Sequence, residues 1–356
     1  MHMPPPIHGA AMMGKAIKDS KLINKLFDGH YINLATAASI SDIGKFSLKK
    51  VTAFVKLLMD IRRNVKKKKP ELVYITPNAK GGAFLKDFLV VQMLKHLKCK
   101  VVIHYHNKGV STKHDSIIYN WAYRHFFKGL KFILLSPALY VDVKKYVKPA
   151  DVFYCANGIA ESNPGMKPIR NNPVPKLLFL SNLIESKGVI VLLDALKLLK
   201  DRGCLFVCTF VGAESQEINA DRFDALVKER NLVEMAEYVG KKYGEEKQQI
   251  YEESDIFVFP TYYHNECFPL VLLEAMENAL PCISTDEGAI SDIIDDGKTG
   301  FVVERKNAKD LADKIELLLN NRHLCKDMGM AGKLKFEQEF TLGKFEERMA
   351  NILSQI

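Results

Sequence analysis

Residues 255–276 read DIFVFPTYYHNECFPLVLLEAM, and this stretch decides the fold class. The apolar run Ile256–Phe259 has the length and composition of a buried strand in a parallel sheet. A short loop with Glu266 follows, and Pro269 stands where a helix is predicted to begin, because proline at the first helical position loses no hydrogen bond. Strand, loop and helix in this order are typical of a ligand crevice at the carboxyl ends of parallel strands.

Two glutamates accompany the predicted helix start. Glu266 lies in the loop and Glu274 about two turns into the helix, with seven residues between them. The backbone N–H groups of Leu270 and Val271 are expected to face an anion, assisted by the helix dipole. Carboxylates only accept hydrogen bonds and therefore suit vicinal hydroxyl groups. We expect the pair to hold two different parts of one ligand.

Strand-length apolar runs alternate with amphipathic helical stretches from end to end, which predicts parallel sheets with helices on both faces. The predicted strands include Leu72–Thr76, Lys100–His104, Phe132–Ser136, Leu177–Ser181, Leu205–Val211, Ala236–Val239, Ile256–Phe259 and Pro281–Ser284. The predicted helices include Val51–Lys66, Ala83–Lys95, Gly188–Arg202, Arg222–Glu229, Glu245–Glu253 and Lys309–Leu319.

A chain of 356 residues is longer than a single hydrophobic core usually accommodates, so two domains are expected. The Pro-, Asn- and Gly-rich text NGIAESNPGMKPIRNNPVPK (157–176) is the best linker candidate. We predict an N-terminal domain over 1–158, a linker over 159–175 and a C-terminal domain over 176–335. A C-terminal helix over 336–356 is expected to pack back on the first domain.

The charge of the chain is lopsided. Residues 1–150 hold 27 Lys/Arg and 8 Asp/Glu, a formal +19, whereas the remainder holds 24 and 34, a formal −10. Such asymmetry predicts an anionic partner for the first half. The chain shows no zinc-finger, RNP-like or helix-turn-helix signature of a nucleic-acid binder. An anionic membrane surface is therefore the favoured partner, although the run Lys66–Lys69 alone is typical of a solvated face.

No run of eighteen apolar residues and no secretory signal is present, and the seven cysteines stand mostly in apolar text. This pattern predicts reduced, cytoplasmic thiols. Cys204 and Cys208 have no partners at zinc spacing, so we expect no metal.

The start, PPPIHGAA (4–11), runs directly into a helical stretch, as a strand-to-helix phosphate loop does. Gly9 before the helix would let the backbone approach a pyrophosphate. Residues 1–3 are too few for a buried strand, so either the start is truncated or the sheet lacks one strand; we favour a truncated start.

Together these segments resemble the retaining glycosyltransferases of family 4, whose GT-B fold has two facing Rossmann-like domains with parallel sheets. The resemblance covers nearly the whole chain and is closest in ECFPLVLLEAMENALPCIST (266–285). It implies that Glu266 contacts the donor hexose and that Glu274 accepts hydrogen bonds from the ribose. The backbone of Phe268, Pro269, Leu270 and Val271 would approach the sugar and phosphate.

A second motif is LLFLSNLIESKGV (177–189). In the family this loop carries an arginine and a lysine that neutralise the donor diphosphate. Lys187 matches the lysine, but Asn182 stands at the arginine position. Asparagine brings no charge and does not replace the bidentate guanidinium, so the diphosphate contact is expected to be weaker or completed from elsewhere.

Family members also place a histidine at the end of the strand that corresponds to VVIHYHNKG (101–109). His104 and His106 lie on the same face of this strand, so alternation does not choose between them. We favour His106, and a buried core histidine is the alternative for either. The resemblance further implies that the Gly9 loop lines the cleft between donor and acceptor.

The resemblance implies a metal-independent hexosyltransferase without cofactor, with Glu266 and His106 at the reacting centre. It would move a hexose from a UDP-, GDP- or ADP-sugar to a hydroxyl of a lipid-linked glycan, with retention of configuration. The setting would be capsule, lipopolysaccharide O-antigen or exopolysaccharide synthesis at the inner face of a bacterial membrane. Alternatives are a sugar-nucleotide epimerase or phosphorylase of the same fold and a catalytically inactive subunit that binds sugar nucleotide. A nucleic-acid binder would explain the charge but none of the motifs.

Overall fold

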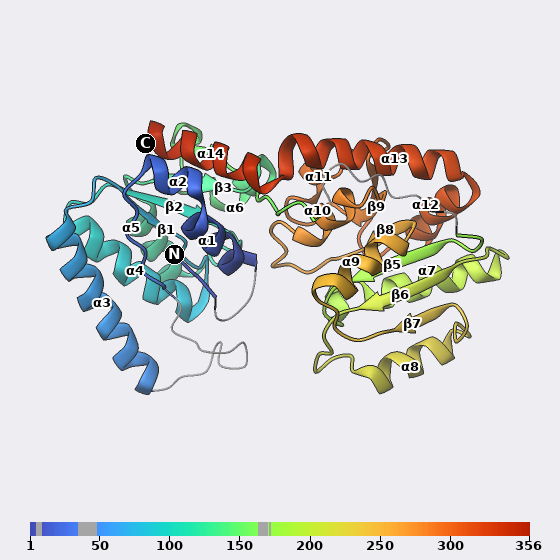
Figure 1. Cartoon of the computed structure of the whole chain (residues 1–356). Helices are drawn as coiled ribbons and strands as arrows, with labels where there is room; N and C mark the ends of the chain where they lie inside the picture. The colour runs from blue at the N-terminus through green and yellow to red at the C-terminus, as the bar shows by residue number, and fades with distance from the viewer. Residues whose placement is uncertain (5–8, 35–47, 163–169, 171) are drawn as a thin grey trace. The chain divides into compact units, whose positions relative to one another are not determined.

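The computed structural model describes residues 1–4, 9–34, 48–162, 170 and 172–356 (Figure 1). Residues 5–8 before Gly9, and 163–169 and 171 of the predicted linker, lie outside the described residues. The chain forms two compact units. Unit 1 comprises Met1–Asn157 and Leu342–Ile356, and unit 2 comprises Gly158–Thr341.

Unit 1 is built on a four-stranded parallel sheet with the strand order β1-β2-β3-β4. Its strands are β1 (Val73–Ile75), β2 (Val101–Tyr105), β3 (Lys131–Leu134) and β4 (Val152–Tyr154). The described residues before α1 form no strand.

Alternate residues of these strands enter two separate cores, because successive side chains of a strand point to opposite faces. Ile103 and Phe132 pack with α3, α4 and α5, whereas Val102 and Ile133 pack with α1, α2 and α14. The helices are α1 (Gly9–Asp19), α2 (Lys21–Leu26), α3 (Leu48–Lys68), α4 (Gly81–His96), α5 (Ile117–Phe127) and α14 (Leu342–Gln355). The sheet therefore lies between two helical layers.

Unit 2 is built on a six-stranded parallel sheet with the order β10-β9-β8-β5-β6-β7. The strands are β5 (Lys176–Leu180), β6 (Val207–Val211), β7 (Ala236–Tyr238), β8 (Ile256–Phe259), β9 (Cys282–Thr285) and β10 (Gly300–Val303). From the neighbours β5 and β8 the chain continues in opposite directions across the sheet. This is a topological switch point, where ligands of open parallel sheets bind at the carboxyl ends of the strands.

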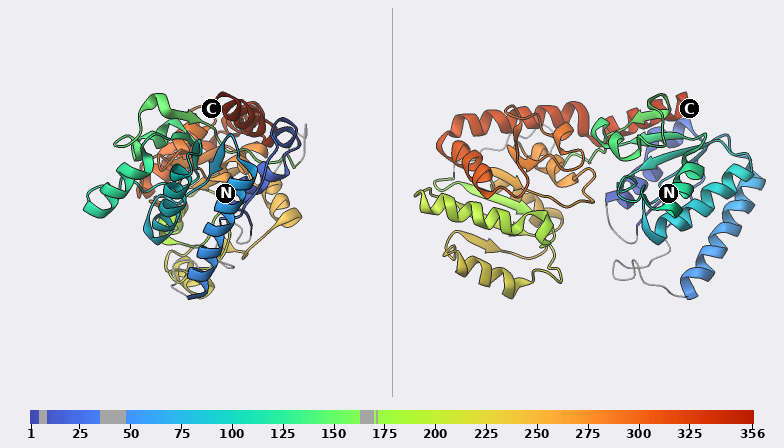
Figure 2. Two further views of the ribbon diagram at one scale, coloured as in Figure 1. Left: turned by 90° about the vertical axis from the view of Figure 1, so that its left-hand side faces the viewer. Right: turned by 180° about the vertical axis from the view of Figure 1, so that it is seen from behind.

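The helices of unit 2 cover both faces of this sheet. Right-handed crossovers from β5 to β6 and from β8 to β9 place α7 and α10 on opposite faces, as the opposite views in Figures 1 and 2 show. On these faces α7 packs with α12, and α10 packs with α13. The main helices are α7 (Val189–Asp201), α8 (Ala220–Glu229), α9 (Gly244–Glu253), α10 (Leu270–Glu277), α12 (Ala308–Asn320) and α13 (Arg322–Lys335).

The predicted parallel sheets are confirmed, and β8 has the predicted bounds. The prediction for Pro269 is wrong by one residue. Helix α10 begins at Leu270, and Pro269 is its N-cap with an extended backbone (φ −72°, ψ 113°). The proline still loses no helical hydrogen bond there, because the first N–H groups of a helix have no partner within it.

No helix among the described residues is both long and apolar enough to span a bilayer.

Candidate functional site

The predicted site residues of unit 2 lie on loops and a helix start at the carboxyl ends of β5 and β8. Gly188 ends the β5 loop with a φ of +94°, and a Cβ there would collide with the carbonyl of Pro260 after β8. Gly288 has a φ of +64°, and a Cβ there would lie 2.5 Å from the carbonyl oxygen of Glu266. The loop that carries Glu266 is therefore packed tightly, backbone to backbone, between its neighbours.

Lys187 and Glu266 contact one another directly. The 3₁₀ turn Glu185–Lys187 carries the lysine, and its Nζ lies 2.5 Å from Oε2 of Glu266. The two side chains are only 15% and 11% exposed, and Nζ also lies 4.4 Å from the ring centroid of Tyr263. The cation and the anion predicted to bind different parts of one ligand thus neutralise each other in this structure.

Glu274 on α10 is held by two side chains of α9. Its Oε1 lies 2.7 Å from Nζ of Lys247, and its Oε2 accepts a hydrogen bond of 3.0 Å from the hydroxyl of Tyr251. Burial, together with the charge of Glu274, raises the pKa of Tyr251 well above its ordinary value, so the phenol stays protonated and donates. The carboxylate is therefore oriented before any ligand binds.

Lys247 and Tyr251 stand one helical turn apart, so both reach the same neighbour. Sequence reasoning did not identify Tyr251 as part of the site. The four-residue spacing of a cation and a phenol on α9 was its only signal, and that spacing says nothing about which carboxylate they meet.

The N-terminus of α10 presents backbone groups rather than side chains. The first N–H groups of a helix, here those of Leu270 and Val271, have no partner within the helix. Pro269 is buried and its carbonyl accepts a hydrogen bond of 3.2 Å from the Leu272 N–H. The side chain of Phe268 is buried against Phe340, with ring centroids 6.0 Å apart. Phe268 can therefore meet a ligand through its backbone only.

Asn182 is exposed in the loop after β5, and its carbonyl accepts a 2.7 Å hydrogen bond from the Ile184 N–H. The structure brings a different cation to this edge of the sheet. Lys306, in the loop after β10, lies with Nζ 4.6 Å from the ring centroid of Tyr262. The Tyr262 N–H in turn binds the carbonyl of Ser186, next to Lys187, at 2.8 Å. Sequence reasoning missed Lys306 because the loop after β10 carries no motif.

In unit 1 the two candidate histidines differ sharply in environment. His104 is fully buried and its Nδ1 lies 2.7 Å from the hydroxyl of Tyr74. Burial, and then the proximity of His106, lower the pKa of His104 well below its ordinary value, so it is neutral. His106 lies just beyond the end of β2, is partly exposed, and has its ring centroid 4.1 Å from that of His104. His104 is thus a core histidine, whereas His106 is partly exposed although both of its ring nitrogens are buried. The choice of His106 as the ligand-facing histidine stays a prediction.

Two further side chains, which sequence reasoning missed, hold the loop after His106. Asn107 accepts a 2.7 Å hydrogen bond from the Ala79 N–H and donates to the carbonyl of Pro77 at 3.1 Å. The carboxylate of Asp142 accepts hydrogen bonds from the N–H groups of Gly109, Val110 and Ser111 at 2.9, 3.1 and 2.9 Å. The backbone around His106 is therefore tied to neighbouring loops.

Gly9 is the first residue of α1, whereas the sequence predicted it in the loop just before the helix. A Cβ at Gly9 would meet no atom of the described residues within 4 Å. Among the described residues, therefore, no neighbour requires glycine at this position.

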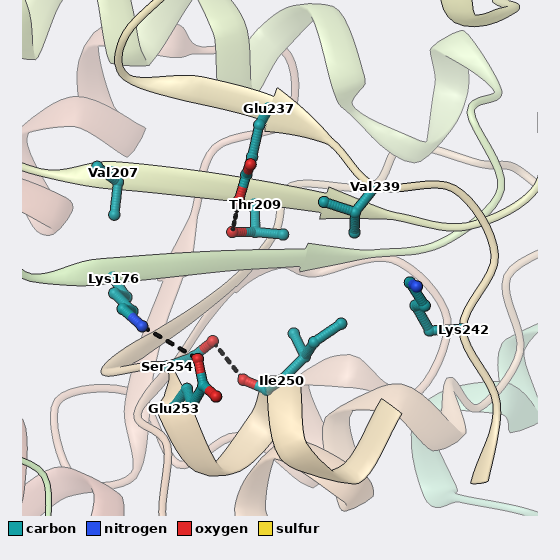
Figure 3. Close-up of a pocket in the computed structure, with 9 residues that line it drawn as sticks. All are labelled: Lys176, Val207, Thr209, Glu237, Val239, Lys242, Ile250, Glu253 and Ser254. Carbon is teal, nitrogen blue, oxygen red and sulfur yellow. Dashed lines mark hydrogen bonds and ion pairs between the residues drawn. The ribbon is translucent and has the colours of Figure 1, made fainter. Parts of the chain in front are cut away.

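A groove of about 270 Å³ lies elsewhere in unit 2, between α9 and the strands β5, β6 and β7 (Figure 3). Four of its polar side chains form two pairs: Lys176 with Glu253 at 3.1 Å and Thr209 with Glu237 at 3.1 Å. Its lining, as far as the described residues show, contains none of the predicted site residues. Among those same residues no three His, Cys, Asp or Glu side chains gather as metal ligands.

Comparison with known proteins relates the chain to glycosyltransferases. Residues 166–335 match the family model described as glycosyl transferases group 1. The chain is 29% identical to the capsular polysaccharide biosynthesis glycosyltransferase CapM of Staphylococcus aureus, over 46% of this chain and 41% of CapM. It is 22% identical to the putative colanic acid biosynthesis glycosyltransferase WcaL of Salmonella typhimurium, over 73% of this chain and 65% of WcaL. These matches span less than two thirds of either relative.

Among solved structures, HepE of Anabaena in complex with UDP superposes with a TM-score of 0.71 at 16% identity, over 85% of this chain and 82% of HepE. The two parallel-sheet α/β units are those of the GT-B fold, so the predicted fold class is confirmed.

Proposed function

We propose that the chain, which matches the group 1 glycosyl transferases over residues 166–335, is a retaining, metal-independent hexosyltransferase. One observation carries the proposal. At the switch point of unit 2, Glu266 lies 2.5 Å from Lys187, and on the adjoining helix Glu274 is oriented by Lys247 and Tyr251. Two carboxylates and a cation beside a helix N-terminus suit a ligand with two sets of hydroxyls joined by a diphosphate.

In this proposal the ligand is a nucleotide-diphospho-sugar. Glu274 accepts hydrogen bonds from the ribose hydroxyls, and Glu266 binds the hexose hydroxyls. Lys187 and the N–H groups of Leu270 and Val271 receive the diphosphate, whose charge grows as the bond to the sugar breaks. Preorganised donors at the place where charge develops stabilise the transition state.

Retention of configuration follows from attack of the acceptor hydroxyl on the face that the diphosphate leaves. The proposal includes no covalent protein nucleophile. His106 in unit 1 is proposed to position substrate, supported by its place just beyond the end of β2 and by the neutral ring of His104 beside it. Gly9 is proposed to let a sugar or phosphate approach the N-terminus of α1, since no described atom occupies the space beside it.

The proposed acceptor is a lipid-linked glycan in the synthesis of a bacterial surface polysaccharide. The similarity to glycosyltransferases of capsular polysaccharide and colanic acid biosynthesis supports this setting. The formal +19 of residues 1–150 supports work at the anionic inner face of the cell membrane.

A second candidate function is a subunit that binds sugar nucleotide without turning it over. One observation favours it: the exposed, neutral side chain of Asn182 stands where the resemblance implies an arginine. Removing an arginine from a diphosphate site removes a bidentate contact as well as a charge.

A panel of UDP-, GDP- and ADP-sugars tests both candidates. A bound donor at a hundred times its Kd raises the free energy of unfolding by about 2.7 kcal/mol, which a thermal shift detects. With the donor identified, release of nucleoside diphosphate is measured with and without glycan acceptors. We expect Glu274→Ala to lose at least about 90% of turnover and Glu234→Ala, an exposed carboxylate before β7, to behave as wild type.

Unchanged turnover in Glu274→Ala would sink the site assignment. Donor binding without nucleotide release, with every acceptor tried, would favour the inactive subunit. The chelator EDTA is expected to leave turnover unchanged, and loss of activity restored by Mg²⁺ would contradict metal independence.

A further inference from the structure

Helices α4 and α5 of unit 1 carry large apolar side chains on their outer side. Ile117, Ile118 and Trp121 of α5 are 86%, 70% and 55% exposed, and Leu85 and Leu89 of α4 are 42% and 52% exposed. We call these five residues the α4–α5 face. Leu85 and Leu89 stand one turn apart, as do Ile117 and Trp121, so each pair lies on one side of its helix.

The two helices join into one surface. The ring centroid of Trp121 lies 5.8 Å from that of Phe88 on α4, and the Lys95 Nζ of α4 binds the carbonyls of His125 and Phe126 on α5 at 2.7 and 2.9 Å. The apolar side chains of the two helices therefore form a single patch rather than scattered residues. Contiguous exposed apolar patches mark interaction sites.

Packing within unit 1 does not explain this patch. The inner sides of both helices already fill the core with other residues, among them Phe84, Val91, Ala122 and Phe126. A helix that only covers a sheet carries polar residues on its outer side. Isoleucine at two neighbouring exposed positions, followed by tryptophan, is a departure from that rule and calls for a partner.

Exposed cations accompany the patch. Arg124 of α5 and Lys128, the C-cap of that helix, are exposed one and two turns beyond Trp121. The helix itself contains no acidic residue, and the one exposed carboxylate just before it is Asp115. The acidic residue of α4, Asp87, is fully buried. Helix α3, which packs beside α4, has eight Lys/Arg and one Asp. Its own exposed residues Val51, Val55 and Met59 repeat every four positions.

We infer that the α4–α5 face is the surface by which unit 1 docks on an anionic lipid bilayer. Ile117 and Ile118 would enter the boundary between head groups and acyl chains, and Trp121 would sit at the head-group level, where its ring favours an interface. Arg124, Lys128 and the basic α3 would meet the lipid phosphates. A second copy of the same face fits poorly, because two strongly basic surfaces repel one another.

This inference rests on the proposed function for its membrane setting, and the test keeps the two apart. Trp121 is the one tryptophan of the whole chain, so intrinsic fluorescence reports on this surface alone. With vesicles of phosphatidylglycerol and phosphatidylcholine we expect a blue shift of the emission and quenching by lipids brominated in the acyl chains. Pure phosphatidylcholine vesicles, or 0.5 M salt, are expected to weaken binding at least about tenfold, since charge attraction is screened.

Paired variants locate the surface. Ile117→Ser with Ile118→Ser leaves the reporter in place and is expected to weaken vesicle binding at least about tenfold. The matched control, Leu205→Ser with Val233→Ser, changes two residues of unit 2 that are 74% and 62% exposed and is expected to bind as wild type. Circular dichroism and thermal melting of all variants establish that each is folded.

Three results would overturn the inference. They are no binding of wild type to anionic vesicles, binding without any change in Trp121 emission, and equal binding by the serine pair. Loss of a concentration-dependent dimer in the serine pair would identify a second copy as the occupant instead. Nucleotide release in vesicle-free buffer distinguishes the proposed transferase activity from the proposed membrane docking. Turnover by a protein that does not bind vesicles would refute the docking and leave the transferase activity standing. Vesicle binding without turnover refutes the transferase alone.

Discussion

Lys187 and Glu266 are each other's nearest opposite charge in the structure, at 2.5 Å, although the proposed function assigns them to different parts of the donor. Both side chains are largely buried, so the attraction between them is screened little by solvent. A diphosphate that reaches Lys187 therefore competes with Glu266. A complete donor offsets this competition, because its hexose hydroxyls give the displaced carboxylate new partners.

The competition yields a prediction for Glu266→Gln. The neutral amide holds Lys187 less strongly, so we expect the free nucleoside diphosphate to bind about fivefold more tightly, equivalent to about 1 kcal/mol. Sugar transfer is expected to fall at least about a hundredfold, since the hexose loses its carboxylate contact. Isothermal titration calorimetry and a nucleotide-release assay measure the two effects. Weaker binding of nucleoside diphosphate by the variant would show that the ion pair does not compete with it.

The positions of single residues explain which parts of the candidate site could be predicted from the sequence. Glu266, Glu274 and Lys187 stand in motifs with regular spacing, and the structure brings Glu266 to Lys187. Tyr251 reaches Glu274 across the packing of α9 on α10, and Lys306 reaches Tyr262 from the loop after β10. Neither contact leaves a trace in local spacing, because it depends on where separate elements meet.

Among the elements, buried strands were the most predictable. Ile256–Phe259 is apolar at every position and central in its sheet, and its predicted bounds are those of β8. Helix α5 is not among the helices named from the sequence, and IIYNWAYRHFF is apolar at eight of its eleven positions, which blurs a helical period. The residues that blur the period, Ile117, Ile118 and Trp121, are those that the structure exposes. The same exposed apolar side chains therefore obscure the helical period of α5 and form its unusual surface.

The Glu266 loop packs against Gly288, in the loop after β9, and Gly297, in the turn before β10, provides a matched control for experiment. Gly288 and Gly297 both have a positive φ, of +64° and +74°, which costs a non-glycine residue about 1 kcal/mol. A Cβ at Gly288 also meets the carbonyl oxygen of Glu266 at 2.5 Å, whereas one at Gly297 meets nothing within 4 Å in the described part of the chain.

We predict that Gly288→Ala costs roughly 2–4 kcal/mol and displaces the Glu266 loop, with at least about a tenfold loss of transfer. Gly297→Ala is expected to cost about 1 kcal/mol and leave transfer unchanged. Urea unfolding and steady-state kinetics of the two variants compare backbone strain with and without the steric contact. Equal effects on transfer would mean that packing against Gly288 does not position Glu266.

At the scale of the whole molecule, the two units differ in whether one continuous segment of the chain forms them. Unit 2 is one continuous segment, Gly158–Thr341, whereas unit 1 is completed by α14. Phe345 and Met349 of α14 are fully buried against Met13 and Ile17 of α1 and against Val102 of the sheet. One face of the unit 1 sheet therefore depends on residues more than two hundred positions away.

Removing residues 342–356 is predicted to destabilise unit 1 selectively. Two fully buried side chains alone contribute about 3–6 kcal/mol, a large part of the free energy of unfolding of a typical domain. Limited proteolysis of the shortened protein should degrade unit 1 first and leave a fragment of unit 2. Fragments in the same order and at the same rate as in the full chain would contradict this dependence.

The position of α14 also has a consequence for synthesis on the ribosome. Domains generally fold in the order in which they emerge, but the sheet of unit 1 leaves the exit tunnel long before the helix that covers it. Unit 2 can complete its core while Val102 and Ile133 still lack Phe345 and Met349 as neighbours. The basic, first-made half is thus expected to finish folding last, and in the interval its uncovered apolar face is a natural client for chaperones.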